Sequence, residues 1–275
     1  MANAIEQHYA TDGIAERILA AVRATLKPGE PMTPDALAPV DHFHGGGLAS
    51  TREMVKSLAP APNDKVLDIG SGIGGPARWI AKTFSCHVTG IDLTADFCRA
   101  AETLNTATGL ADKVSIVHGS ALALPFADAS FDRAYSQNVV MNIADKAAFY
   151  REARRVLKPG GLLVLSNLAR GTGPEPNYPT PWAASAATSF LSTAETTKTE
   201  IAAAGLRIVS FKADTSAASH AAQAAQRLRF EAEGLPPLGP HLIVGPRLLE
   251  YRLKSMRNTE DGRIVAIEVV AERVG

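Results

Sequence analysis

The chain has 275 residues, of which 46% are hydrophobic and 20% are charged, and its 28 lysines and arginines balance its 28 aspartates and glutamates. This length and composition predict a globular protein with one large core, and the absence of a net basic field disfavours nucleic acid or an anionic membrane as partner. We therefore expect a small neutral or zwitterionic ligand.

Targeting and cysteine signals point to a cytoplasmic protein. The N-terminus lacks a basic region followed by an apolar stretch, and no run approaches the ~18 apolar residues of a membrane span. We therefore expect no membrane insertion. Cys86 and Cys98 have neither a disulfide framework nor metal-ligand spacing, so no bound metal is expected.

The first 62 residues are expected to form a helical lid. Asp12 is placed to cap a helix whose apolar spacing continues to about Leu26. A proline-rich link is expected up to Pro39. After the segment HGGGLAST, a second helix is expected to run to about Leu58, where two prolines stop it.

Short apolar and β-branched runs alternate with helical stretches from Lys65 onward. Helices are expected to begin near Gly75, Thr94 and Asp145. The intervening strands are predicted at 65–69, 87–92, 113–119, 131–136 and 161–167. This alternation is typical of βα units around a parallel sheet, and we place the core of the protein at 63–215.

The C-terminal part departs from this alternation. Residues 169–185 contain four prolines and are expected to form a long functional loop. A helix at 193–204 and a strand at 207–214 follow. Two helical segments at about 216–233 and 241–256 then precede a last strand at 262–272. We interpret 216–260 as an inserted helical substrate cover and 261–275 as the final strand of the sheet.

The stretch VLDIGSGIGG, residues 66–75, predicts a ligand site at the end of the first strand. Glycines before a helix let the backbone approach a ligand and direct free N–H groups toward it. The spacing Gly70-x-Gly72-x-x-Gly75 also fits a dinucleotide fingerprint, with Asp92 ending the next strand. The structural alternative is a tight turn that binds nothing.

Asp68 distinguishes between cofactors. A carboxylate two residues before the first glycine opposes the negative charge of a pyrophosphate, which argues against NAD. A ligand with an ammonium group, a ribose and no phosphate suits both Asp68 and Asp92, and S-adenosylmethionine is such a ligand. The alternative is that Asp68 only caps the amides of the loop.

Five ordered motifs within residues 65–168 resemble those of class I S-adenosylmethionine-dependent methyltransferases. They are VLDIGSGIGG, TGIDLT, HGSALALPF, FDRAYSQNVV and RRVLKPGG. More narrowly, FHGGGLAST, GIGGPAR, GIDLTADFC, MNIADK and TPWA resemble the glycine, sarcosine and dimethylglycine N-methyltransferase type, with the phosphoethanolamine enzymes as more distant relatives. The resemblance implies an α/β, Rossmann-like methyltransferase fold: a mostly parallel seven-stranded sheet with helices on both faces and a helical cover.

The resemblance also implies which residues bind the cofactor, in addition to Asp68. Those near the methionine and ribose are Gly70, Ser71, Gly72, Asp92 and Gln137, and those around the adenine are Leu93, Ser120, Ala121 and Leu122. Ser120 departs from the family, which commonly has Asp after the glycine corresponding to Gly119. Its hydroxyl is a weaker acceptor for the adenine amino group.

Tyr9, Asn138 and Asn142 are the catalytic candidates. Close relatives tend to carry His where Asn138 stands, and the phosphoethanolamine enzymes place a catalytic His at the position of Asn142. Neither asparagine is a general base, but both can orient an acceptor. The alternatives are capping roles for the asparagines and, for Tyr9, a simple anchor of the first helix.

A second glycine run, Trp182 and several histidines each have two interpretations. The glycine run at 45–47 either folds over the methionine end of the cofactor or forms a flexible helix entry. Trp182 either lines the acceptor pocket or anchors its loop. Four histidines lie in predicted cover segments and are interpreted as surface or packing residues, with one of them a possible base: His42, His44, His220 and His241.

These observations predict S-adenosylmethionine-dependent methyl transfer to a small-molecule acceptor by a monomer or homodimer. An amine nitrogen is the favoured acceptor, because no strong base stands out in the sequence. A C- or O-methyltransferase acting on a quinone, phenol or natural product is the alternative within the class. An NAD(P)-dependent oxidoreductase and a non-catalytic cofactor-binding protein are the alternatives outside it.

Overall fold

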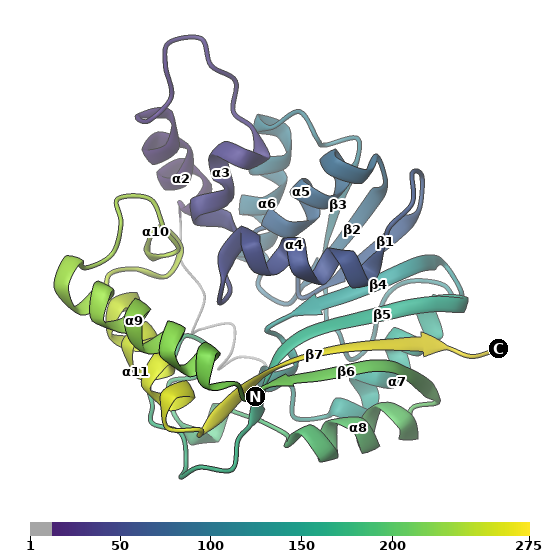
Figure 1. Cartoon of the computed structure of the whole chain (residues 1–275). Helices are drawn as coiled ribbons and strands as arrows, with labels where there is room; N and C mark the ends of the chain where they lie inside the picture. The colour runs from purple at the N-terminus through teal and green to yellow at the C-terminus, as the bar shows by residue number, and fades with distance from the viewer. Residues whose placement is uncertain (1–12) are drawn as a thin grey trace.

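The computed structural model describes residues 13–275, and Tyr9 lies outside this range. A seven-stranded sheet with the order β3-β2-β1-β4-β5-β7-β6 runs through the molecule (Figure 1). The first five strands pair in parallel, while β7 is antiparallel to both of its neighbours. The strands are β1 (Lys65–Ile69), β2 (His87–Asp92), β3 (Val114–His118), β4 (Phe131–Gln137), β5 (Leu157–Arg170), β6 (Leu206–Asp214) and β7 (Ile264–Arg273). The predicted mostly parallel, Rossmann-like sheet is confirmed.

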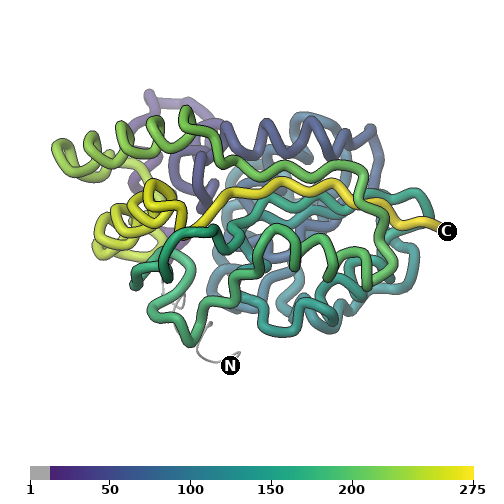
Figure 2. The backbone as a smooth tube through the Cα atoms, turned by 60° about the horizontal axis from the view of Figure 1, so that its bottom comes forward, coloured from purple at the N-terminus to yellow at the C-terminus, as the bar shows by residue number. Residues whose placement is uncertain are grey.

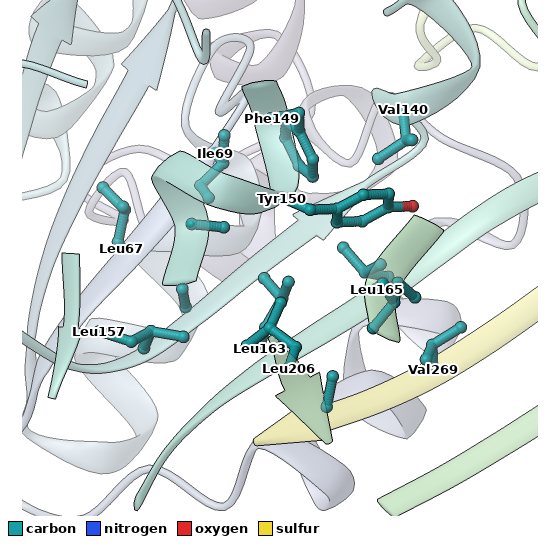
Figure 3. Close-up of a cluster of buried hydrophobic side chains, with 14 of the residues drawn as sticks. Leu67, Ile69, Val140, Phe149, Tyr150, Leu157, Leu163, Leu165, Leu206 and Val269 are labelled. Atoms are coloured by element: carbon teal, nitrogen blue, oxygen red, sulfur yellow. The ribbon is translucent and has the colours of Figure 1, made fainter. Parts of the chain in front are cut away.

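Helices cover both faces of the sheet because alternate strand residues point to opposite sides. Val66 packs in a cluster with α4 (Gly47–Leu58) and α5 (Gly75–Phe84), whereas its neighbour Leu67 packs toward α7 (Lys146–Val156). The cluster that contains Leu67 also includes Ile201 of α8 (Ala194–Ala203), and Figure 3 shows Phe149 and Tyr150 of α7 among side chains of the strands.

Further helices lie beyond the carboxyl ends of the parallel strands. They are α2 (Ile14–Arg23), α3 (Pro34–Asp41), α9 (Ala217–Glu233), α10 (His241–Val244) and α11 (Leu248–Glu260). An apolar cluster joins α2 and α3 to α6 (Ala95–Ala107) and to Ile243 of α10. Figures 1 and 2 show α9 and α11 side by side at the end of the sheet where β6 ends and β7 begins.

Two sequence-based expectations about the helices are wrong. The proline-rich link before Pro39 contains α3, because Thr33 caps it through a hydrogen bond from the backbone N–H of Ala36 and Pro34 occupies its first turn. The expected helix at 241–256 is two helices, since α10 ends at Val244, just before Gly245, whose φ is 87°, and α11 starts at Leu248. No helix within 13–275 is long and apolar enough to cross a membrane.

Candidate functional site

Two cavities lie at the carboxyl edge of the sheet and meet one another. The first, of about 440 Å³, lies over the ends of β1, β2 and β4, and the second, of about 340 Å³, lies between the end of β5, the loop containing Trp182, and helices α9 and α11. Phe43, His44 and Asn138 line both cavities. The two cavities are therefore neighbours that adjoin at these three residues.

The first cavity gathers the predicted cofactor-binding residues. The structure brings all of them to its wall, together with both candidate asparagines: Asp68, Gly70, Ser71, Gly72, Asp92, Leu93, Ser120, Ala121, Leu122, Gln137, Asn138 and Asn142. They come together because parallel strands end at the same edge of the sheet.

The first two glycines of the turn after β1 have different roles. Gly70 and Gly72 both have positive φ, at 82° and 53°. A Cβ on Gly70 would lie 2.3 Å from a methyl group of Val139, so this glycine is required for packing. A Cβ on Gly72 would meet no protein atom within 4 Å and the residue lines the cavity, so its missing side chain leaves room for a ligand.

Asp92 is held in place by the backbone around it. Its Oδ2 accepts a hydrogen bond of 2.8 Å from the N–H of Gly72, and its Oδ1 accepts one of 2.9 Å from the N–H of Thr94. Burial raises the pKa of Asp92, and these hydrogen bonds act in the opposite direction. Each carboxylate oxygen keeps a lone pair for a further donor such as a ribose hydroxyl.

Asp68 is buried beneath the glycine turn. Its Oδ2 accepts a 2.8 Å hydrogen bond from the hydroxyl of Tyr135, and burial raises the pKa of Asp68 to about 7. The amides of Gly70 and Ser71 donate to the carbonyl of Ile91 instead, so Asp68 does not cap them. A buried carboxylate on the cavity wall favours a cationic ligand group.

Two buried polar groups of the predicted cofactor-binding residues have no hydrogen-bond partner among the described residues. They are the hydroxyl of Ser71 and the Nε2 of Gln137, whose Oε1 accepts from Thr51 at 3.3 Å. A buried donor without a partner is costly, so both groups suit a polar ligand that would satisfy them. The cavity thus offers a carboxylate, a hydroxyl and an amide to such a ligand.

The opposite end of the first cavity is largely apolar. Leu93, Ala121 and Leu122 line it, and Ser120 accepts a 3.2 Å hydrogen bond from the N–H of Leu122 through its Oγ. This hydroxyl therefore orders the loop and keeps its own proton for donation. The surface is suited to a flat aromatic ring.

The two candidate asparagines have different surroundings. Asn138 has a φ of 55°, donates its backbone N–H to the carbonyl of Ser166 at 2.7 Å and lines both cavities. Asn142 lines the first cavity, and its side-chain amide donates to the carbonyl of Trp182. Asn138 is therefore the one at the junction, while Asn142 also anchors the proline-rich loop.

A hydrogen-bonded cluster behind the junction was not predicted. The hydroxyl of Thr51 lies 2.9 Å from Nδ1 of His42 and 3.1 Å from Nε2 of His44, in addition to its bond to Gln137. Nδ1 of His44 lies 3.2 Å from the carbonyl of Gly45. Burial lowers the pKa of both histidines to about 4, and they are neutral near pH 7.

Trp182 combines the two roles considered for it. Its ring is buried and lines the second cavity, while its Nε1 donates to the hydroxyl of Ser189 at 3.0 Å. The residue is thus both a wall of this cavity and an anchor of its loop. The sequence indicated Trp182 as a candidate because it lies in a proline-rich segment.

Comparison with known proteins relates this site to a family. Residues 67–165 match the family model described as a methyltransferase domain. Phosphoethanolamine N-methyltransferase 1 of Arabidopsis thaliana is 38% identical over 125 residues, which are 46% of this chain and 25% of that protein. Sterol 24-C-methyltransferase ERG6B of Gibberella zeae is 42% identical over 109 residues, 40% of this chain and 29% of that protein.

A solved structure shares the fold. Phosphoethanolamine N-methyltransferase 2 of Haemonchus contortus, in complex with phosphomonomethylethanolamine and S-adenosylhomocysteine, superposes with a TM-score of 0.69 at 19% identity, covering 86% of this chain and 55% of that one. The chain spans between a quarter and a half of the length of the curated relatives it matches.

The match begins at Leu67 and so includes the glycine turn. The glycine turn therefore lies within the part of the chain that matches a methyltransferase domain. Residues 67–165 of the chain therefore form a methyltransferase domain within this seven-stranded sheet.

Proposed function

We propose that the protein transfers the methyl group of S-adenosylmethionine, bound in the first cavity, to an amine nitrogen of a small molecule in the second cavity. The observation that carries this proposal is the meeting of the two cavities at Phe43, His44 and Asn138. A methyl group can pass from one ligand to the other only where their sites adjoin.

The chemistry of the first cavity supports a specific placement of the cofactor. Its ammonium group would contact the buried carboxylate of Asp68, and its methionine part would contact Ser71 and Gln137, whose polar groups lack partners. The ribose hydroxyls would bind Asp92, and the adenine would lie on the apolar surface that includes Leu93. The carboxylates complement a cationic ligand without a phosphate.

The surroundings of the second cavity support the covering roles of residues 1–62 and 216–260. Phe43 and His44 contribute to its wall from the first segment, and Gln223 and Arg252 contribute from the second. Enclosure of this kind excludes water from the reacting atoms. Within this proposal the chain's own residues align the acceptor with the sulfonium of the cofactor.

The junction favours an amine over an acceptor that needs a strong base. Methyl transfer to an unprotonated amine requires alignment and no proton abstraction before attack. The junction residues are a phenyl ring, an amide and His44, whose pKa burial lowers to about 4. A base this weak is poorly suited to ionise a phenol or a carbon acid.

Turnover with matched acceptors tests the proposal. We expect calorimetry to detect S-adenosylhomocysteine binding, and mass spectrometry to detect N-methylated products from a panel of primary and secondary amines. A parallel panel of phenols and activated carbon acids serves as the comparison. Methyl transfer only to oxygen or carbon contradicts the amine assignment, and cofactor binding without transfer to any acceptor supports a non-catalytic binding protein.

A further inference from the structure

The hydroxyl of Thr51 connects the cover to a residue of the first cavity. Thr51 lies on α4, is 0% exposed and lines neither cavity. Its contact of 3.3 Å with Oε1 of Gln137 is the only hydrogen bond of the Gln137 side chain within residues 13–275, and Nε2 of that side chain has no partner there. Because Gln137 lines the first cavity, Thr51 can affect a ligand of this cavity through Gln137.

Four contacts around Thr51 compete for three protons. The hydroxyl lies 2.9 Å from Nδ1 of His42, 3.1 Å from Nε2 of His44 and 3.3 Å from Oε1 of Gln137, and Nδ1 of His44 lies 3.2 Å from the carbonyl of Gly45. Each contact needs one proton to be a hydrogen bond. The hydroxyl supplies one proton and each ring supplies at most one, because burial lowers the pKa of both histidines to about 4 and they are neutral near pH 7. At least one contact therefore has no proton.

Burial indicates which contact lacks the proton. Gln137 is 9% exposed and its Nε2 is already unpaired, so without the proton of Thr51 the whole side-chain amide would have no partner. Gly45 is exposed, so water can donate to its carbonyl in place of His44. An unsatisfied polar group costs more when it is buried than when water reaches it. The arrangement of lower free energy is therefore the one in which Thr51 donates to Gln137.

The surroundings of His42 agree with this arrangement. If Thr51 donates to Gln137, both rings must donate to the oxygen of Thr51, which places the proton of His42 on Nδ1 and leaves its Nε2 an acceptor. This Nε2 has no hydrogen-bond partner among the described residues and lies 3.8 Å from Oδ1 of Asp41, which also lacks one. Two acceptors form no hydrogen bond, so their separation is consistent with this position of the proton.

We propose that Thr51 is a positioning residue for the cofactor of the first cavity. His42 and His44 donate to its oxygen, and its own proton holds Oε1 of Gln137, so that Nε2 is the end of the amide left to donate to a ligand. In the cofactor placement proposed above, this donor binds the carboxylate of the methionine part. The inference rests on that placement, and it adds a residue outside both cavities to those that determine cofactor affinity.

Calorimetric titration of the full chain with S-adenosylhomocysteine and with adenosine tests this role. Thr51→Val removes the hydroxyl and keeps the shape of the side chain, so S-adenosylhomocysteine should bind roughly three- to tenfold more weakly. Adenosine lacks the methionine part, and its affinity should stay within about twofold of wild type. Thr51→Ser retains the hydroxyl and should restore the binding of S-adenosylhomocysteine.

Thr197→Val is the matched control. Thr197 is also buried, its hydroxyl donates a hydrogen bond of 2.8 Å to the carbonyl of Thr193, and it lines neither cavity. The loss of this hydroxyl should leave both affinities unchanged, because it has no contact with Gln137.

A double-variant cycle shows whether Thr51 acts through Gln137. Gln137→Met removes the amide, and in its presence Thr51→Val should weaken S-adenosylhomocysteine no further. Equal effects of Thr51→Val in both backgrounds contradict this route. Nitrogen-15 NMR of the imidazole rings provides a measurement on the wild-type protein. We expect the protons on Nδ1 of His42 and on Nε2 of His44, and a proton on Nδ1 of His44 overturns the arrangement.

The outcomes separate this inference from the proposed function. Equal S-adenosylhomocysteine affinity of the wild-type protein and Thr51→Val, or an equal loss for both ligands, overturns the positioning role. A wild-type protein that does not bind S-adenosylhomocysteine contradicts the proposed function as well. Affinity that depends on Thr51, without methyl transfer to any acceptor, keeps the positioning role and rejects the proposed reaction.

Discussion

The hydroxyl of Tyr135 donates a 2.8 Å hydrogen bond to Oδ2 of Asp68, and both side chains are buried beneath the glycine turn. Two influences on the carboxylate oppose one another. Burial raises the pKa of Asp68 to about 7, while the hydrogen bond from Tyr135 favours the ionised form. In the free protein near neutral pH, Asp68 is therefore divided between its protonated and ionised forms.

The pH dependence of cofactor binding should report this carboxylate. If the ammonium group of the cofactor contacts Asp68, binding lowers its pKa, so that complex formation near pH 6 releases close to one proton and affinity falls as the pH drops below about 7. Calorimetric titration with S-adenosylhomocysteine in two buffers of different ionisation enthalpy measures the number of protons released on binding. Adenosine, which lacks the ammonium group, is the control, and equal proton release with both ligands contradicts the contact.

Replacement of Gly72 by alanine should reduce cofactor affinity without preventing folding. The new methyl group would point into the first cavity, where no protein atom lies within 4 Å. Gly109→Ala is the matched control, since Gly109 also has positive φ and open space around it but does not line either cavity.

Both alanine variants should lose about 1 kcal/mol of unfolding free energy, because alanine is strained in the left-handed region. Only Gly72→Ala should weaken S-adenosylhomocysteine binding, by roughly tenfold or more. Denaturant titration and calorimetry provide the two values. If Gly72→Ala binds as tightly as Gly109→Ala, the ligand does not approach Gly72.

The parallel half of the sheet was predictable because its signals are local. Each of the first five strands is a short apolar run, and the runs alternate with helical periodicity. The position of β7 between β5 and β6 was not predicted, because it depends on pairing between segments far apart in the chain, such as Leu163 with Ala271. The start of α3 had a readable signal in Thr33 and Pro34, which the neighbouring prolines obscured.

The residues of the candidate site also fall into a group that the sequence predicts and a group that it does not. The predicted cofactor residues follow strand ends, and strand order alone brings them to one edge. Arg252 was missed because nothing in its local sequence distinguishes it from ordinary polar residues. Thr51 ends the segment HGGGLAST, which the sequence indicated as part of the cover, but the segment does not show which of its residues matters. Their importance depends on the partners that tertiary packing provides or withholds, which only the structure reveals.

Removal of one partner of the buried ion pair between Arg78 and Asp41 should strongly destabilise the protein. Nη2 of Arg78 donates at 2.9 Å to Asp41 of α3. The same guanidinium donates to the carbonyl of Ile73 and to Asn105, so it joins the cover to the glycine turn. Arg78→Met should cost roughly 3–5 kcal/mol of unfolding free energy, because it leaves a buried carboxylate without its partner.

Denaturant titration of the single and double variants tests this assignment. The double variant Arg78→Met with Asp41→Asn should recover part of the loss, since it removes the unpaired charge. A double variant less stable than Arg78→Met would show that the penalty does not come from Asp41.

Asn138→Gly should lower kcat while cofactor affinity stays within about twofold of wild type. Asn138 has a φ of 55°, so glycine keeps the backbone and its hydrogen bond to Ser166 while it removes the amide from the junction of the cavities. We expect kcat to fall by roughly tenfold, because the acceptor loses a group that orients it. Asn138→Ala, which adds backbone strain, should also lose stability. If kcat of Asn138→Gly equals that of the wild type, Asn138 only forms the turn after β4, as in the capping interpretation of its sequence position.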